Sequence, residues 1–280
     1  MRVGVSGASG FIGKHLCAAL RARGDDVLET SMRDPQQAAG LASQCDAFVN
    51  LSGENLGQRW NDRVKREILR SRTELPQRFL EALSTMQARP HTYVSASAVG
   101  YYGTSETATF TESDPSGSDF LARVCAEWER VAHTGEPLGM RVACVRAGLV
   151  LAADGGVLAK LLPVFKSGMG GRAGSGKQWS SWIHIDDAVG IYLLAIDRAA
   201  GAINAVAPNP ARNADVAEAL GRLLHRPAAV AVPAFVVKAA LAQGATLILE
   251  GQRVLPARAQ AEGYAFKFPQ LEDALTNLLG

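Results

Sequence analysis

The chain opens with Val3-Gly4-Val5-Ser6-Gly7-Ala8-Ser9-Gly10-Phe11-Ile12-Gly13, an apolar strand that runs directly into a glycine-rich turn and a helix. Gly7 and Gly10 lack a Cβ, so the backbone can bend tightly and approach a pyrophosphate, and Gly13 lets the helix pack closely on the strand. The helix N-terminus adds unpaired N–H groups and the positive end of a dipole. The stretch predicts a dinucleotide site, although a turn without a ligand can use the same glycines. The expected cofactor contacts are Gly7, Ser9, Gly10, Phe11, Ile12 and Gly13.

The end of the second strand indicates which nicotinamide cofactor is bound. Val27–Thr30 is expected to be this strand, and Ser31 and Arg33 follow it. A site for NAD places Asp or Glu here to accept hydrogen bonds from the ribose 2′-hydroxyl. A guanidinium and a hydroxyl instead suit a 2′-phosphate. Glu29 is a competing acidic signal inside the strand, and Arg33 could be a solvated loop residue, but the pattern favours NADP(H).

Strand-like and helix-like segments alternate along much of the chain, which is typical of a parallel sheet covered by helices on both faces. We expect strands at Arg2–Ser6, Val27–Thr30, Ala47–Leu51, Thr92–Ser95 and Val142–Arg146. We expect helices at Gly13–Arg23, from Asn61 through Arg72 to Leu83, at Asp119–His133, Asp186–Asp197, Ala214–Leu224 and Leu271–Leu279. The predicted fold class is α/β: a Rossmann-type doubly wound parallel sheet with a smaller C-terminal substrate lobe.

The alternation ends near residue 206, after which prolines punctuate the chain. This change predicts an NADP-binding Rossmann domain at 1–206, with a loop insertion near 163–182, and a substrate or capping lobe at 207–280. Within the insertion, residues 168–177 form a glycine-rich loop that carries Arg172 and Lys177. The loop is interpreted either as a substrate lid or as a surface segment.

Composition excludes several other classes of function. The hydrophobic share of 48% and charged share of 20% are typical of a globular protein, and a net charge of +2 does not favour nucleic acid as a partner. The four cysteines lack metal-type spacing and suit reduced core thiols, so no metal site is predicted and a cytoplasmic location is expected. No apolar run is long enough to span a bilayer, and no signal peptide is expected. The sequence leaves an oligomer open.

Ligands of such sheets bind beyond the carboxyl ends of the strands, so the residues that follow each strand are candidates for the site. Leu51, Ser52 and Gly53 follow the third strand, and small residues there let the backbone lie against a cofactor. Ser95 and Arg146 stand at the ends of the next two strands. These five residues are predicted to contact the cofactor.

Taken in order, the strand-end segments are similar to those of extended short-chain dehydrogenases/reductases, which include sugar-nucleotide epimerases and dehydratases. The segments Leu249-Glu250-Gly251-Gln252-Arg253-Val254-Leu255-Pro256 and Gly263-Tyr264-Ala265-Phe266-Lys267-Phe268-Pro269 narrow the resemblance. With Gly53-Glu54-Asn55-Leu56, Arg59-Trp60 and Ser71-Arg72, essentially the whole chain resembles the atypical subgroup called epimerase family proteins. In this group the end of the helix Asn61–Arg72 lies near the cofactor, which implies that Arg72 pairs with a phosphate and Glu67 with a ribose hydroxyl. Surface salt bridges are the alternative for both.

The chain departs from this group where the catalytic Tyr-x-x-x-Lys is expected. Aligning the group's pattern on Glu129 places Leu121 and Cys125 at the two catalytic positions, and neither can move a proton between substrate and solvent as that Tyr does. The same helix face carries Trp128 at helical spacing, which is more typical of core packing than of a cofactor contact. Ordinary Tyr/Lys chemistry is therefore not expected, whereas NADP binding is.

Four residues are candidate replacements for the missing dyad. Tyr101 and Tyr102 follow a strand end and could face the nicotinamide, or could be packing residues of a loop. Ser97 lies one place from the position of the family's catalytic hydroxyl. His184 could be a general base, or could be structural, with Asp186 or Asp187 capping the next helix.

Two classes of function remain open. The first is an NADP-dependent epimerase or oxidoreductase that acts on a hydroxylated small molecule such as a nucleotide sugar. The second is a non-catalytic, NADP(H)-sensing regulatory or interaction protein on the same fold, because fold alone does not decide function. The sequence does not name the substrate.

Overall fold

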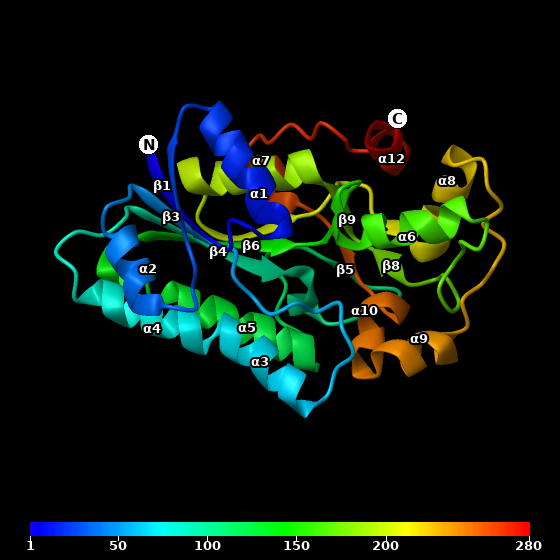
Figure 1. Ribbon diagram of the computed structural model, residues 1–280, viewed down its shortest axis with the longest axis horizontal. Helices are drawn as coiled ribbons and strands as arrows, with labels where there is room; N and C mark the ends of the chain where they lie inside the picture. The colour runs from blue at the N-terminus through cyan, green and yellow to red at the C-terminus, as the bar shows by residue number, and fades with distance from the viewer.

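Six parallel strands form the central sheet of the computed structural model, which describes residues 1–280. Their order across the sheet is β10-β6-β4-β3-β1-β2 (Figure 1). Their bounds are β1 Arg2–Ser6, β2 Asp26–Thr30, β3 Ala47–Asn50, β4 Thr92–Ala98, β6 Arg141–Ala147 and β10 Gly201–Ala205. The predicted doubly wound α/β class is confirmed.

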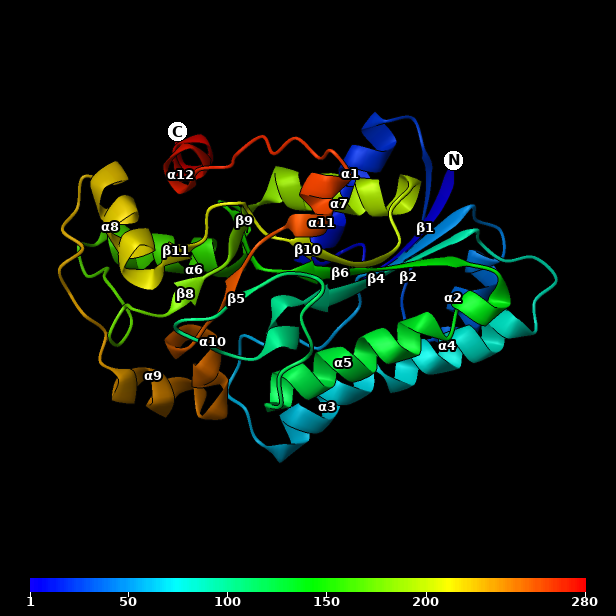
Figure 2. The ribbon, with the colours of Figure 1, turned by 180° about the vertical axis from the view of Figure 1, so that it is seen from behind.

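Helices cover both faces of this sheet, as Figures 1 and 2 show. On one face lie α1 (Phe11–Ala22) and α7 (Ile185–Asp197), packed on strand residues such as Val5 and Val145. On the other lie α2 (Pro35–Ala42), α3 (Asp62–Arg72), α4 (Glu74–Ser84) and α5 (Phe120–His133), with α2, α4 and α5 packed around Phe48 and Tyr93. Alternate strand residues therefore enter different cores, as expected for a parallel sheet buried on both faces.

The strand order reverses at β1, which lies between β2 and β3. In the register, Ser6 at the end of β1 pairs with Thr30 on one side and Asn50 on the other. Crevices at such a switch point, outside the carboxyl ends of the strands, are where ligands of these sheets bind. The topology therefore places the ligand crevice at the Gly7–Gly13 turn.

A second group of elements lies beyond the carboxyl ends of the strands (Figure 2). Three small two-stranded pairs join β7 to β9, β8 to β11 and β5 to β12. The other elements of the chain, including η2 before β6 and α11 in the main core, are η1 Val99–Tyr102, β5 Thr109–Phe110, η2 Glu136–Leu138, β7 Leu149–Ala152, α6 Gly156–Lys166, β8 Trp179–Ser180, β9 Trp182–His184, β11 Ala211–Arg212, α8 Asn213–Leu223, α9 Ala234–Leu241, η3 Gln243–Ala245, α10 Thr246–Leu249, β12 Arg253–Val254, α11 Ala257–Ala261 and α12 Leu271–Leu279.

The C-terminal segment returns to the main sheet after α10. Ala259 of α11 belongs to the core under α1 and α7. Asp187 then holds the following segment, because its carboxylate accepts hydrogen bonds from the Tyr264 hydroxyl (3.0 Å) and from the backbone N–H groups of Lys267 (2.8 Å) and Phe268 (2.9 Å). The domain boundary at residue 206 stays a prediction.

Two differences from the predicted elements have local causes. The long helix expected from Asn61 to Leu83 is two helices that meet at Thr73. Pro76 has no N–H to donate to the carbonyl of Arg72 and its ring disfavours helix there, so the break falls where proline requires it. In the predicted insertion, α6 extends to Lys166 with Pro163 inside it, and the loop starts afterwards.

Candidate functional site

The N-terminus of α1 presents free hydrogen-bond donors at the switch point. Gly10 caps the helix without a side-chain bond, and the N–H groups of Phe11, Ile12 and Gly13 have no acceptor within the protein. Gly7 has φ +76°, and a Cβ there would lie 2.9 Å from the backbone of Leu51. A Cβ on Gly13 would overlap the carbonyl oxygen of Gly7. The turn thus has the shape and donors that a diphosphate requires.

The end of β2 carries an arginine without an ion-pair partner. Arg33 is exposed, forms no salt bridge, and its backbone N–H donates to Ser31 Oγ (3.2 Å). Glu29, the competing acidic residue, instead accepts from Arg21 of α1 at 2.5 Å. The available side chains at this strand end are therefore a guanidinium and a hydroxyl.

Asn50 orients the loop after β3, a role the sequence did not indicate. Its Oδ1 accepts from Ser6 Oγ (2.7 Å) and from the backbone N–H of Ser52 (3.1 Å). These bonds tie the ends of β1 and β3 together and fix Leu51, Ser52 and Gly53 beside the glycine turn. The predicted cofactor loop is thus next to the predicted phosphate site.

The two candidates on α3 differ in environment. Glu67 lies on the surface and pairs with Arg70 (3.2 Å), which is the alternative that the sequence left open. Arg72 is 8% exposed, and its guanidinium lies 5.1 Å from the ring centre of Trp128. Only Arg72 is therefore enclosed near the ends of the strands, and no salt bridge holds it.

Arg146 is the centre of a buried polar cluster. The sheet register places Ser97, Arg146 and Asn204 side by side on three strands. Glu129 of α5 accepts two bonds of 2.8 Å from Arg146 and one of 2.6 Å from Ser97 Oγ. The Tyr102 hydroxyl accepts from Arg146 (2.8 Å) and donates to Asn204 Oδ1 (2.7 Å).

This cluster distinguishes between the two tyrosines. Burial raises the pKa of Tyr102 to about 12, although Arg146 opposes the shift, and both bonds of its hydroxyl are within the protein. Tyr101 is half-buried, its ring stacks on the Arg146 guanidinium at 3.5 Å, and its hydroxyl has no protein partner. Of the two, Tyr101 is the one with a free hydroxyl.

Two predicted site residues, Arg146 and Ser97, belong to this cluster, and Ser95 lies outside it. Burial opposes the charge on Arg146, but the hydrogen bonds and charge of Glu129 outweigh it and raise the pKa of the guanidinium. Ser97 donates its proton to Glu129, and the buried Ser95 donates to the carbonyl of Ala96 (3.0 Å). The cofactor roles of Ser95 and Arg146 and the catalytic role of Ser97 stay predictions.

His184 is itself the N-cap of α7, so the prediction that Asp186 or Asp187 caps this helix is wrong. Its Nδ1 accepts from the backbone N–H of Asp186 (3.0 Å), and its Nε2 lies 3.2 Å from Asn277 Oδ1. The ring is buried, and this burial lowers its pKa. With both nitrogens engaged, the structure favours the structural role over that of a general base.

The two positions of the missing dyad are packed. Leu121 and Cys125 of α5 lie against η1, with the Cys125 sulfur 3.9 Å from where a Cβ of Gly100 would be. Burial raises the pKa of the Cys125 thiol to about 12, so it is protonated at neutral pH. This face has no side chain able to replace the tyrosine.

The glycine-rich loop contacts the predicted C-terminal lobe. Gly171 forms a β-bridge with Ala229, and Ala173 forms one with Val232. From the same lobe, Gln252 Nε2 donates to the carbonyl of Val99 (2.7 Å), in the turn after β4. The lobe therefore lies directly over the carboxyl end of β4.

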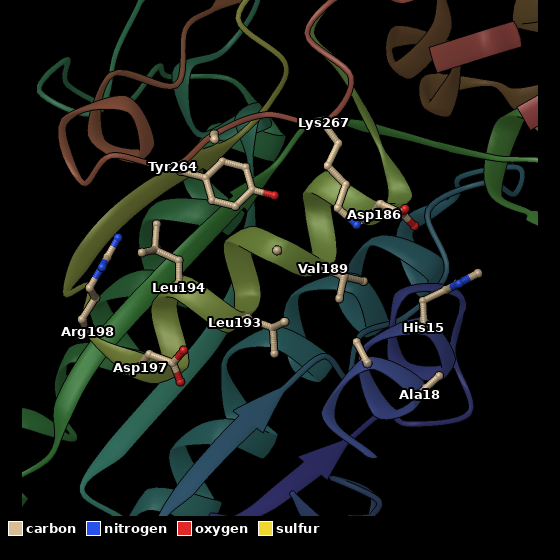
Figure 3. A pocket seen from close by; sticks show the side chains of 13 residues that line it. His15, Ala18, Asp186, Val189, Leu193, Leu194, Asp197, Arg198, Tyr264 and Lys267 are labelled. Carbon is tan, nitrogen blue, oxygen red and sulfur yellow. Dashed lines mark hydrogen bonds and ion pairs between the residues drawn. The ribbon is translucent and has the colours of Figure 1, made fainter. Parts of the chain in front are cut away.

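A separate groove of about 680 Å³ lies on the outer side of the α1–α7 layer (Figure 3). Its walls include His15 of α1 and Asp186 of α7, and Tyr264 and Lys267 of the returning segment lie along it. It is not at the carboxyl ends of the strands. No group of three or more His, Cys, Asp or Glu is placed to bind a metal, and none of the helices is long and apolar enough to cross a membrane.

Sequence comparison assigns the family. The NAD dependent epimerase/dehydratase family matches residues 3–206, and a domain of unknown function, DUF1731, matches residues 232–278. The chain belongs to the epimerase/dehydratase family. The human epimerase family protein SDR39U1 is 39% identical over 294 residues, which cover 100% of both chains. The chloroplastic SDR39U1 homolog of Arabidopsis thaliana is 41% identical over 303 residues, 100% of this chain and 87% of that one.

Solved structures of the family share the fold. The crystal structure of human SDR39U1 (isoform 2) with NADPH has a TM-score of 0.91 at 36% identity and covers 99% of both chains. The nucleoside-diphosphate sugar epimerase of Corynebacterium glutamicum has a TM-score of 0.80 at 33% identity, over 100% of this chain and 58% of that one. The predicted family and fold are confirmed.

Proposed function

We propose that this family member binds NADP(H) at the switch point. The N–H groups of Phe11, Ile12 and Gly13 would hold the diphosphate, and Ser31 and Arg33 would hold the 2′-phosphate. The observation that carries the proposal is the unpaired Arg33, together with the diversion of Glu29 to Arg21. The NADPH in the human relative's crystal structure supports the same choice.

For the chemistry, we propose an epimerase or oxidoreductase that acts on a nucleotide sugar. Bound NADP(H) supplies hydride transfer. Tyr101 would provide the hydroxyl that exchanges a proton with the substrate, because its hydroxyl has no other partner. Tyr102 would hold Arg146 in place beneath it.

Two arginines stacked on Trp179 support an anionic substrate. Arg212 and Arg253 lie over the Trp179 ring, at 3.6 and 5.3 Å from its centre, and neither forms a salt bridge. The Nε of Arg253 is buried without a partner. Both guanidinium groups bond to the segment that follows η1, Arg212 to the carbonyl of Glu106 (3.2 Å) and Arg253 to Thr109 Oγ1 (3.3 Å). A diphosphate is the anion that two such guanidinium groups suit.

The packing of Leu121 and Cys125 supports the second candidate, an NADP(H)-sensing protein without turnover. Both candidates share the cofactor site and differ in whether Tyr101 acts. A panel of nucleotide sugars, followed by NADPH absorbance and sugar analysis, tests the difference. Turnover that falls about 10²-fold or more in Tyr101→Phe supports the enzyme, and no turnover on any sugar supports the sensor.

Calorimetric titration with NADPH and NADH tests the cofactor proposal. A bidentate charged contact contributes about 1.5–3 kcal/mol, so NADPH should bind at least about tenfold more tightly than NADH. Arg33→Ala should remove this preference, whereas Arg226→Ala, an exposed arginine of the lobe, should keep it. Equal affinities in the unmodified protein would refute the proposal.

We also propose a cytoplasmic location. All four cysteines are free and buried, which suits a reducing compartment. Fractionation of cells that express the tagged chain tests this, and recovery outside the cytoplasm would contradict it.

A further inference from the structure

Arg72 is a buried cation without a salt-bridge partner. Its guanidinium donates to the carbonyls of Glu54 (3.0 Å) and Ile68 (3.3 Å) and to Ser71 Oγ (3.4 Å), while its Nε–H has no acceptor in the protein. The nearby Glu54 carboxylate is engaged by Gln58 at 2.7 Å. Arg72 is 8% exposed, so its free Nε–H is a donor that a polar ligand at this site can meet.

Its position is at the ends of β3 and β4. A Cβ on Gly53, after β3, would lie 3.0 Å from the Arg72 Cζ. On the other side, Arg72 counteracts the burial that raises the pKa of Cys125, so guanidinium and thiol are neighbours. The Nε1 of Trp128, whose ring lies under the guanidinium, is also buried without a partner. Cys125 lies at the helical position where the extended short-chain dehydrogenases/reductases carry the lysine of their Tyr-x-x-x-Lys motif.

We infer that Arg72 supplies from α3 the cation that position 125 lacks, and that it binds the hydroxyls of the nicotinamide ribose. The inference rests on the proposed function, because it needs NADP(H) at the switch point. It revises the sequence expectation that Arg72 pairs with a phosphate.

The geometry favours a ribose over a phosphate at Arg72. The diphosphate already has the free N–H groups of α1, at the end of β1. Arg72 lies beyond the Leu51–Gly53 loop, toward β4 and α5, where the cofactor would continue from the diphosphate. A planar guanidinium with an unused Nε–H can donate to adjacent hydroxyls, and it stays charged.

Binding of three ligands to Arg72→Met tests the inference. NADPH and 2′-phospho-ADP-ribose contain the second ribose, whereas 2′-phospho-ADP has the diphosphate and the 2′-phosphate but ends before that ribose. We expect the first two to bind about 10- to 100-fold more weakly, and 2′-phospho-ADP to change less than twofold. Arg72→Lys keeps the charge and should lose less. Arg70→Met, two residues away on the exposed face of α3, is the control and should leave all three affinities unchanged.

The outcomes separate this inference from the cofactor proposal. Equal weakening of all three ligands would mean a phosphate contact or a displaced loop, and no weakening would mean no contact; either result overturns the inference. If only NADPH binds more weakly, Arg72 contacts the nicotinamide ring and not the ribose, and the inference is again overturned. If the unmodified protein binds none of the three, the cofactor proposal itself fails. If Arg72→Met does not fold, Arg72→Lys is decisive, because a loss of affinity confined to the two ligands with the second ribose is still required.

Discussion

Glu129 and Arg146 face each other through two parallel hydrogen bonds of 2.8 Å, inside a cluster that joins α5 to three strands. The side chains of Glu129 and Arg146 are 8% and 4% exposed, so water cannot replace a lost partner. The Ser97 hydroxyl also depends on this carboxylate.

Glu129→Gln should therefore lower the free energy of unfolding by about 3–5 kcal/mol, because it leaves the Arg146 charge buried and unpaired. The matched control is Glu127→Gln, which breaks an exposed pair with Arg130 and should change stability by less than about 1 kcal/mol. Urea unfolding of both variants measures the difference. Equal stabilities would show that the cluster does not hold the strand ends.

Substitutions in the glycine turn should separate ligand binding from folding. Gly10 has extended backbone and is exposed, and a Cβ there meets only the Gly7 oxygen at 3.0 Å. Gly10→Val should keep the fold, at a cost of about 1 kcal/mol for the poorer cap, and should abolish NADPH binding. Gly13→Val should lose both the fold and NADPH binding, because the valine side chain would overlap the backbone of Gly7 and Ala8.

Thermal unfolding with and without NADPH checks this prediction. The control is Gly40→Val in α2, where a Cβ meets nothing within 4 Å. If folded Gly10→Val is still stabilised by NADPH, the turn does not bind the phosphates.

The structural features that the sequence predicted follow from local patterns. The turn from Gly7 to Gly13 is written in consecutive residues, and the break at Thr73 could have been read from Pro76. The cluster around Arg146 could not be predicted, because parallel pairing joins Ser97, Arg146 and Asn204 from strands far apart in sequence. Burial is equally non-local: nothing in the composition of α3 indicates that Arg72 is enclosed and Glu67 is not.

Protonation of His184 should destabilise the protein at acidic pH. Its Nδ1 accepts the N–H of Asp186, so a proton on Nδ1 would place two donors against each other, and burial further lowers the pKa below its ordinary value of 6.5. The unfolded chain then binds the proton more readily than the folded chain. Stability from this group is complete above about pH 6.5 and is lost as the pH falls below it.

Denaturant unfolding at pH 7.5 and 5.5 measures this effect. His184→Asn keeps a capping oxygen but does not titrate, so its loss of stability on acidification should be smaller than that of the unmodified protein. His91→Asn, at an exposed histidine, is the control. The prediction is contradicted if His184→Asn loses as much stability between pH 7.5 and pH 5.5 as the unmodified protein does.

Introducing the family dyad should not increase turnover while Arg72 is present. Cys125→Lys places a second cation beside the buried guanidinium, and like charges in such a site cost several kcal/mol. Leu121→Tyr must also fit a face packed against Gly100. The double variant should therefore be less stable than the unmodified protein and gain no turnover. A double-mutant cycle isolates the cause: Cys125→Lys should be milder in the Arg72→Met background, with a coupling of at least about 1 kcal/mol. Additive effects would mean that the two positions do not share one cation site, and a gain of turnover in the dyad variant would mean that the face is open to the cofactor.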